Sequence, residues 1–266
     1  MPNWVKQLHK KRHMPRWYGS VVLAILVFLM FIGGGLVWAG RNLPPPRFGL
    51  TDRGLLTPVD YPLWRQVSDW LARRKYIMLT FDDGPYGYGV DEKIIAILEK
   101  HGARAVFFEV CAHINDTTRE VLQKILVAGN VIANHSYDHE HLPDLKGPSL
   151  KIQIEGCNSK LAAASGLRPT LFRPPFGQLS PEVVDVIRAS GLQLVLWDAN
   201  SGDSWLKEPQ KIIEMSLYEA SLGGSILLMH SRPTTADALD ELLTKLRRRG
   251  YRFALPGPYK KNTEEG

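Results

Sequence analysis

Cysteine is scarce in this sequence: its 266 residues include only Cys111 and Cys157. Their spacing matches no cysteine pattern of metal-binding proteins, so a cysteine-based metal site is not indicated. Two interpretations of the pair stay open, a disulfide bond in an exported domain or two buried free thiols. The sequence also has no internal repeat and no low-complexity segment. Its length suits one substantial core or at most two small domains.

Acidic residues are absent from the first 19 positions, which contain five lysines and arginines. This segment therefore supplies +5 of the formal net charge of +6. Residues 75–256 contain 20 basic and 22 acidic residues, a net charge of −2. Because the basicity belongs to the N-terminus, nucleic-acid binding by the folded domain is not expected.

A long apolar segment follows the basic N-terminus. It includes the run VVLAILVFLMFIGGGLVWAG, which reaches the roughly 20 apolar residues that a membrane-spanning helix needs. We expect a cytoplasmic tail at residues 1–17 and a single transmembrane anchor at 18–40. Since positive charge precedes the span, the rest of the chain is expected outside the cytoplasmic membrane. A cleaved signal peptide ending near Ala39 is the alternative, and it also exports the domain.

The remaining sequence predicts a spacer followed by an α/β domain. Residues 41–74 contain Pro44-Pro45-Pro46 and no long periodicity, which is typical of a stiff spacer. Residues 75–256 then alternate between strand-like and amphipathic helical segments, and 257–266 resemble a frayed tail. The seven predicted strands are 76–81, 104–110, 131–135, 170–173, 192–198, 225–230 and 251–255. This alternation predicts a parallel, barrel-like domain with its chemistry at the carboxyl ends of the strands.

Two helix starts have recognisable signals. Thr117 and Glu120 have the spacing of a capping box, which predicts that a helix opens there. Ser180-Pro181 supplies an N-cap followed by a proline at the first helical position.

Polar side chains gather where the predicted strands end. Asp82 and Asp83 close the first strand, and because neighbouring strand residues face opposite sides, we expect one to hold a metal and the other to face a reactant. His135 ends the third strand, and His139 would share its face if this segment formed a helical turn. Two histidines and one carboxylate with open positions are typical of catalytic zinc.

Three later strands end in the same way. The fourth is followed by Arg173-Pro174-Pro175-Phe176-Gly177, a rigid turn that aims a permanent cation over the strand ends. The fifth runs through Trp197-Asp198 to Asp203-Ser204-Trp205, and the sixth ends on His230. Each of these features alone could have only a structural role, such as a turn or a helix cap. Their occurrence at successive strand ends indicates a catalytic site.

These motifs resemble, in order and spacing, those of the polysaccharide deacetylase family (NodB homology domain, carbohydrate esterase family 4). They are TFDDGP, HSYDH, RPPFG, the segment with Asp203 and Trp205, and ILLMH, and the resemblance spans about residues 75–255. It implies a distorted (β/α)7 barrel and a metal-dependent hydrolase that converts N-acetyl groups of a glycan to acetate and free amine. The implied cofactor is a divalent ion, zinc first, with cobalt, manganese and nickel as alternatives.

The resemblance also implies a role for individual residues. Asp82 is expected to be the general base and His230 the general acid. The metal ligands would be Asp83, His135 and His139. Arg173 would hold Asp82, and Asp203 would in turn hold Arg173.

Substrate contacts follow from the same motifs. The backbone N–H of Phe176 would stabilise the oxyanion, and Leu228 would line the pocket for the acetyl methyl group. Ser204 separates Asp203 from Trp205, unlike the common family pattern, so either Trp197 or Trp205 would form the aromatic wall.

Other function classes share parts of this pattern. Non-haem iron oxygenases also use two histidines and one carboxylate but do not need Asp82 and His230 as a base and acid. A cyclic-imide or lactam hydrolase is a closer variant. A catalytically silent glycan-binding module would lack the base, a ligand or the acid, and this sequence has all of them. The expected substrate is an envelope glycan, either peptidoglycan or an exopolysaccharide of the N-acetylglucosamine type.

Overall fold

The structure is a computed structural model that describes residues 48–50, 56–58, 75–222 and 225–255. The predicted cytoplasmic tail, the anchor at 18–40, most of the spacer and the tail at 257–266 lie outside these residues. The described residues belong to one of two units into which the chain divides, Pro45–Gly266. Within them, no helix has the length and apolar character needed to cross a membrane.

The spacer contains a short strand pair that the sequence did not predict. β1 (Phe48–Leu50) and β2 (Leu56–Pro58) pair antiparallel, with Gly49 opposite Thr57. Strands of three residues are too short to produce a recognisable alternation of polar and apolar residues.

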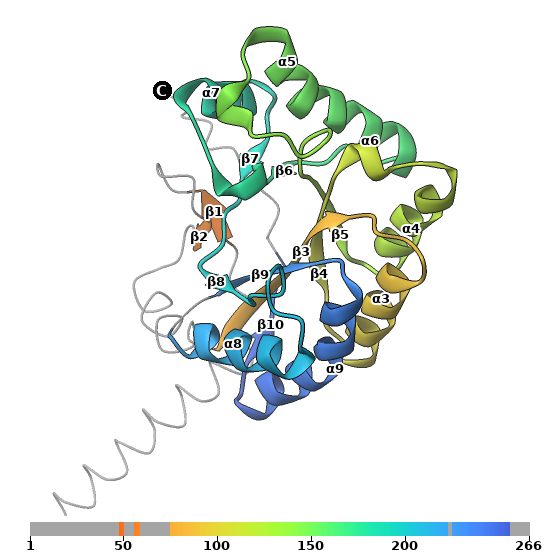
Figure 1. Ribbon diagram of the computed structural model, residues 1–266, viewed down its shortest axis with the longest axis vertical. Coiled ribbons are helices and arrows are strands. Elements are labelled where there is room, and N and C mark those ends of the chain that lie inside the picture. Colours follow the sequence, from red (N-terminus) through yellow and green to blue (C-terminus); the bar gives the residue numbers. More distant parts are fainter. Residues whose placement is uncertain (1–47, 51–55, 59–74, 223–224, 256–266) are drawn as a thin grey trace, which may run out of the picture. The chain divides into compact units, whose positions relative to one another are not determined.

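A curled, all-parallel sheet forms the centre of the domain (Figure 1). Its strands lie in the order β7-β6-β5-β4-β3-β9-β8, and β10 pairs with the first residues of β3. Within the described residues no pairing joins β7 to β8, so the sheet is open there. The strands are β3 (Tyr76–Gly84), β4 (Ala105–Glu109), β5 (Val131–Asn134), β6 (Leu171–Phe172), β7 (Gln193–Leu194), β8 (Ala199–Asn200), β9 (Ile226–His230) and β10 (Arg252–Phe253).

The structure confirms a parallel α/β sheet of the predicted kind but corrects the number of strands. Of the strand predicted at 192–198, only residues 193 and 194 form a strand, β7, and β8, which begins just after the predicted segment, was not predicted. Between them, the carbonyl groups of Val195 and Leu196 accept hydrogen bonds from the Arg173 guanidinium, each at 3.2 Å. These carbonyls are therefore turned to a side chain instead of a neighbouring strand, which interrupts the sheet.

Helices lie along the outer side of the curled sheet (Figure 1). They are α3 (Val90–Lys100), α4 (Asp116–Val127), α5 (Gly147–Lys151), α6 (Cys157–Ser165), α7 (Pro181–Ala189), α8 (Pro209–Ser221) and α9 (Pro233–Arg248), with a π-helical turn (Ile152–Gly156) between α5 and α6. The two faces of β3 bury different clusters because side chains alternate along a strand. Ile77 and Leu79 belong to the large cluster shared with the helices, whereas Met78 belongs to a smaller cluster on the inner face.

One predicted helix start is confirmed and the other is wrong. The Ser180 hydroxyl accepts a hydrogen bond from the Val183 N–H at the start of α7. At α4 the capping box is formed by Asn115 and Thr118, two residues before the predicted pair. The Asn115 carboxamide oxygen accepts from the N–H of Thr118, and the Thr118 hydroxyl accepts from the N–H of Asn115.

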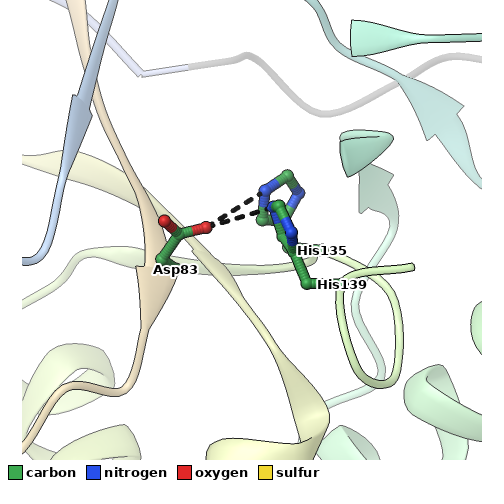
Figure 2. Close-up of side chains that lie close together, drawn as sticks. All are labelled: Asp83, His135 and His139. Carbon is green, nitrogen blue, oxygen red and sulfur yellow. Dashed lines mark ion pairs between the residues drawn. The ribbon is translucent and has the colours of Figure 1, made fainter. Parts of the chain in front are cut away.

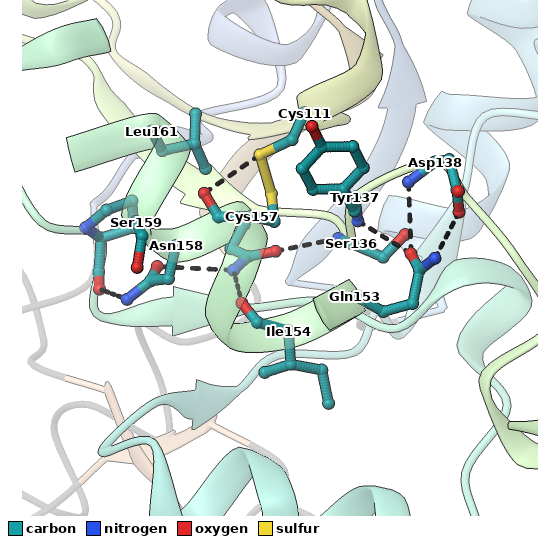
Figure 3. The surroundings of a disulfide bond; sticks show 12 residues. Cys111, Ser136, Tyr137, Asp138, Gln153, Ile154, Cys157, Asn158, Ser159 and Leu161 are labelled. Carbon is teal, nitrogen blue, oxygen red and sulfur yellow. Dashed lines mark hydrogen bonds between the residues drawn. A yellow bond between two sulfur atoms is a disulfide. The ribbon is translucent and has the colours of Figure 1, made fainter. Parts of the chain in front are cut away.

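A disulfide bond joins Cys111 and Cys157 (Figure 3), which settles the choice left open by the sequence. Cys111 opens a 3₁₀ turn (Cys111–His113) after β4, and Cys157 is the first residue of α6. The N–H of Cys111 donates to the carbonyl of Ser136 at 3.1 Å. The bond therefore joins α6 to the 3₁₀ turn after β4, and the backbone of this turn contacts the loop after β5.

Removing this cross-link should destabilise the domain. We expect the double variant Cys111→Ala, Cys157→Ala to lower the free energy of unfolding by about 2–4 kcal/mol, chiefly because the unfolded chain gains freedom. Urea unfolding followed by tryptophan fluorescence measures this. Wild-type protein under a reductant should unfold at the same midpoint as the double variant. An unchanged midpoint in the variant would show that the bond contributes no stability.

Candidate active site

Asp83, His135 and His139 converge on one point at the carboxyl edge of the sheet (Figure 2). Asp83 Oδ1 lies 3.6 Å from His135 Nε2 and 3.3 Å from His139 Nε2. Two ligands of a tetrahedral zinc ion, each about 2.0–2.2 Å from it, are about 3.4 Å apart. The spacing of these three side chains therefore suits a single small cation.

The end of β3 separates the two aspartates, as the sequence predicted. Asp82 continues the strand and pairs with Phe108 of β4 and His230 of β9. The register with β4 then shifts between Asp82 and Gly84, and Asp83 adopts a positive φ of 66°. Such an irregularity changes the direction of a side chain at a strand end. It turns Asp83 toward the two histidines, while Asp82 stays buried on the inner face of the sheet.

The two histidines are brought together by a turn, and the predicted helical turn is wrong. Ser136 and His139 have positive φ values of 70° and 64°. Side chains accept the hydrogen bonds of the local backbone, which competes with helix formation. The Asn134 carboxamide accepts from the N–H of Ser136, and the Gln153 carboxamide oxygen accepts from the N–H groups of Tyr137 and Asp138 (Figure 3).

The donor atoms of this site are in the correct state to hold a cation. Asp83 Oδ1 is buried and has no hydrogen-bond partner among the described residues. Burial raises the pKa of Asp83, but the nearby His135, His230, His139 and Arg232 outweigh this and lower it below its usual value. His135 Nδ1 lies 2.7 Å from the carbonyl oxygen of Arg173. Because a carbonyl only accepts, Nδ1 carries the proton and Nε2 presents its lone pair to the site. One carboxylate and two imidazoles therefore fit a divalent ion such as zinc.

Arg173 contacts Asp82, as the resemblance implied. Its guanidinium is fully buried and donates to Asp82 Oδ1 at 2.7 Å and to the Thr80 hydroxyl at 2.8 Å. The same group stacks 4.1 Å from the ring centre of Phe108. The other oxygen of Asp82, Oδ2, lies 3.6 Å from His135 Nε2. Arg173 and Thr80 therefore hold the Asp82 side chain at the edge of the metal site.

The expected contact between Asp203 and Arg173 is wrong. Asp203 Oδ1 instead lies 2.7 Å from His230 Nδ1, and Oδ2 accepts from the N–H of His230 at 2.7 Å and the hydroxyl of Thr235 at 2.6 Å. Arg173 already donates to Asp82, Thr80 and two carbonyls, and Asp82 balances its charge.

The contact with Asp203 gives His230 the properties of a proton donor. Burial lowers the pKa of His230, but the hydrogen bond and charge of Asp203, together with Asp82 and Asp83, raise it above its usual value. Its Nδ1–H is committed to Asp203, while Nε2 lies 3.9 Å from Asp83 Oδ2. A protonated Nε2 is thus directed at the metal site.

The predicted substrate-contact residues surround the site in different ways. Phe176 has a positive φ of 60°, and its half-exposed ring lies 4.8 Å from the ring of His139. Leu228 is buried on β9 two positions before His230, so both side chains are on the same face. Trp205 is 56% exposed, whereas Trp197 packs under the guanidinium of Arg173, 5.6 Å from ring centre to Cζ. Of the two tryptophans, Trp205 has the surface available for a ligand.

Sequence reasoning missed two charged residues at this edge. Arg232 forms an ion pair with Asp83 Oδ2 at 3.3 Å, and its position two residues after His230 was the available signal. Glu109, the last residue of β4, is fully buried, and no hydrogen-bond partner of its carboxyl oxygens is found among the described residues. Burial, followed by the charges of Asp91 and Asp82, raises the pKa of Glu109 well above its usual value, which favours the neutral form of this carboxyl group.

Comparison with known proteins assigns the chain to a family. A family model described as polysaccharide deacetylase matches residues 72–195. A solved structure of peptidoglycan deacetylase PdaC from Bacillus subtilis aligns with a TM-score of 0.62 at 32% identity, covering 67% of this chain and 86% of that one. The chain belongs to the polysaccharide deacetylase family.

Curated relatives are longer proteins. Peptidoglycan-N-acetylmuramic acid deacetylase PdaC of Bacillus subtilis (strain 168) is 32% identical over 180 residues, which cover 68% of this chain and 38% of PdaC. Peptidoglycan-N-acetylglucosamine deacetylase PgdA of Listeria monocytogenes (strain EGD-e) is 31% identical over 67% of this chain and 37% of PgdA. The chain thus spans less than two fifths of the length of these two relatives.

A second solved structure shows that this fold does not by itself establish catalysis. BA3943 from Bacillus anthracis, described as a CE4 family pseudoenzyme, aligns with a TM-score of 0.63 at 27% identity, covering 67% of this chain and 63% of that one. Activity in the present chain must therefore be inferred from its own site residues.

The contact between Asp203 and His230 predicts a change in pH dependence. In Asp203→Asn the carboxylate that raises the pKa of His230 is lost, so His230 deprotonates at lower pH. We expect the alkaline limb of the kcat/KM profile for acetate release to move to lower pH, with about a 10- to 100-fold loss at pH 8.

Thr235→Val is the matched control, because it removes a hydrogen bond to Asp203 and keeps the carboxylate. Its alkaline limb should stay close to that of the wild type. An unmoved limb in Asp203→Asn would mean that His230 is not the group that titrates there.

Proposed function

We propose that this chain is a metal-dependent deacetylase that hydrolyses N-acetyl groups of an envelope glycan to acetate and a free amine. The observation that carries the proposal is the arrangement of five side chains at one edge of the sheet. Asp83, His135 and His139 surround a single point. Asp82 Oδ2 lies 3.6 Å from His135 Nε2, and His230 Nε2 lies 3.9 Å from Asp83 Oδ2, so both side chains border this cluster.

The cation would be held by Asp83 Oδ1, His135 Nε2 and His139 Nε2. When bound, a divalent ion lowers the pKa of a coordinated water from about 15.7 toward 7 and polarises a carbonyl group. Zinc is our first choice, because one carboxylate and two imidazoles are typical of its catalytic sites.

Asp82 is suited to accept the proton of the attacking water. Its Oδ1 forms a buried ion pair with the guanidinium of Arg173 at 2.7 Å. Arg173 and Thr80 also fix the orientation of this side chain, so that Oδ2 faces the metal site. A correctly positioned general base typically raises the rate of a reaction by about 10²–10⁴-fold.

His230 is suited to protonate the departing nitrogen. Asp203 holds its ring and stabilises the imidazolium, which keeps a proton on Nε2 when the amine leaves. The N–H of Phe176 would stabilise the developing oxyanion, an interaction whose loss typically costs about 2.7–4 kcal/mol in the barrier. Leu228 would contact the acetyl methyl group from the same face of β9 as His230.

Peptidoglycan is the substrate that the comparisons favour. The named relatives deacetylate either its N-acetylmuramic acid or its N-acetylglucosamine units. Export is supported by the basic N-terminus that precedes the apolar segment at 18–40, and by the Cys111–Cys157 disulfide, since such bonds persist in oxidising compartments. We accordingly place the domain on the outer side of the cytoplasmic membrane, anchored by the N-terminal segment.

The alternatives receive less support from the site. An iron oxygenase needs no base and acid flanking its metal ligands. A silent glycan-binding protein needs neither the buried pair of Arg173 with Asp82 nor the pair of Asp203 with His230. Arg173 orients Asp82 and Asp203 orients His230, and a reaction that transfers protons needs both of these side chains in position.

Acetate release from purified protein tests the proposal. We expect the full chain in detergent to release acetate from peptidoglycan or an N-acetylglucosamine oligomer when zinc is present. A chelator should abolish release and added zinc should restore it. Asp82→Asn should lower kcat by about 10²–10⁴-fold, because the general base is lost while the metal ligands remain.

Two controls make this result specific. Asp240→Asn changes an exposed aspartate that pairs with Lys100 far from the site, and it should leave the rate unchanged. Zinc content, measured by mass spectrometry, should be equal in Asp82→Asn and wild type. Acetate release that persists without metal, or an undiminished rate in Asp82→Asn, would contradict the mechanism.

A further inference from the structure

Arg232 is a cation at the metal site that the proposed mechanism does not use. It is the N-cap residue of α9, and its guanidinium lies 3.3 Å from Asp83 Oδ2 and donates to the carbonyl of Ser204 at 3.3 Å. About a third of its side chain is exposed. Within the described part of the chain, it is the only lysine or arginine that forms an ion pair with the three-residue metal cluster.

Once a cation is bound, no carboxylate of the site among the described residues would balance the charge of Arg232 alone. Arg173 is compensated by Asp82, and protonated His230 is compensated by Asp203. The only ion pair of Arg232 among the described residues is with Asp83, whose charge would then be shared with a divalent ion. A partly exposed guanidinium beside a cation is electrostatically unfavourable unless an anion approaches both.

The guanidinium also keeps hydrogen-bond donors for such an anion. It has five N–H donors in a fixed planar arrangement that matches a carboxylate, and two contacts within the described residues account for only part of them. Because Asp83 and Ser204 hold it from two sides, little freedom is lost when a ligand binds. Arg232 is therefore a preformed site for a carboxylate next to the reacting acetamide.

We infer that Arg232 binds a carboxylate on the sugar that is deacetylated and so favours N-acetylmuramic acid units over N-acetylglucosamine units. This inference rests on the proposed deacetylase function. The two sugars differ by a lactyl ether on carbon 3, which is bonded to carbon 2, the carbon that carries the acetamide. A residue that recognises the lactyl carboxylate must lie within a few ångströms of the metal site, as Arg232 does. The carboxylate must be free, so the recognised strand is one without its stem peptide.

The first test compares two substrates that differ only in charge. One is the disaccharide of N-acetylglucosamine and N-acetylmuramic acid with a free lactyl carboxylate, and the other is the same disaccharide with that carboxylate reduced to an alcohol. For the zinc-loaded wild type we expect kcat/KM, measured at the muramic acid unit by mass spectrometry, to be at least about tenfold higher for the acid. Equal values would overturn the inference.

Substitutions then assign the preference to Arg232. In Arg232→Gln the ratio of the two kcat/KM values should fall to near one, and Arg232→Lys should retain part of it because the charge remains. Lys207→Gln is the matched control, since it removes an exposed positive charge from the neighbouring loop and should leave the ratio unchanged. If Arg232→Gln slowed both substrates equally, Arg232 would only position Asp83, and the inference would be wrong.

A binding measurement separates this inference from the proposed function. Calorimetric titration of zinc-loaded Asp82→Asn should show tighter binding of the acid than of the alcohol by at least about tenfold, and Arg232→Gln in that background should remove the difference. Acetate release without this difference overturns only the role of Arg232. A difference in binding without acetate release by the wild type overturns the deacetylase instead.

Discussion

The buried ion pair between Arg173 and Asp82 is the interaction on which the rest of this site depends. A fully buried guanidinium must be paired and hydrogen-bonded, because removing one partner of such a pair typically costs about 3–5 kcal/mol. Arg173 meets this need with Asp82, Thr80 and two carbonyls of the segment after β7. Its own carbonyl accepts the proton of His135 Nδ1. One residue therefore orients the base, fixes the tautomer of a metal ligand and interrupts the sheet between β7 and β8.

The parallel register supplies the remaining geometry. Asp82 of β3 pairs with His230 of β9 in the parallel register, so the base and the acid lie next to each other at the edge of the sheet. β5 lies two strands from β3, beyond β4, and the loop with His135 and His139 begins at its end. The disulfide includes Cys111, whose N–H donates to the carbonyl of Ser136 in this loop. Arg232 follows β9 and reaches the same edge. Side chains that are separated by up to 150 residues in the sequence thus lie together, because the parallel strands that carry them end at the same edge of the sheet.

Much of this was predictable, and the errors have physical causes. The strands and their polar ends could be recognised because an apolar segment that ends in charged residues is typical of a buried parallel strand, and the order of the motifs then assigned the metal ligands. The early end of the strand predicted at 192–198, the turn at His139 and the partner of Asp203 could not be recognised. Each depends on a side chain from a distant segment, Arg173, Gln153 or His230, that competes for a hydrogen bond. Glu109 was missed because the strand was predicted to continue to residue 110, which placed this acid inside the strand and not at its end.

The claim at the centre of this account is that a single cation lies among Asp83, His135 and His139. Anomalous diffraction from crystals grown with zinc, recorded on both sides of the zinc absorption edge, tests it directly. The account predicts one strong peak at this edge of the sheet, bonded to Asp83 Oδ1 and to Nε2 of both histidines, with Asp82 and His230 both beside it. A peak bound by other residues, or no peak at zinc concentrations that support activity, would contradict it.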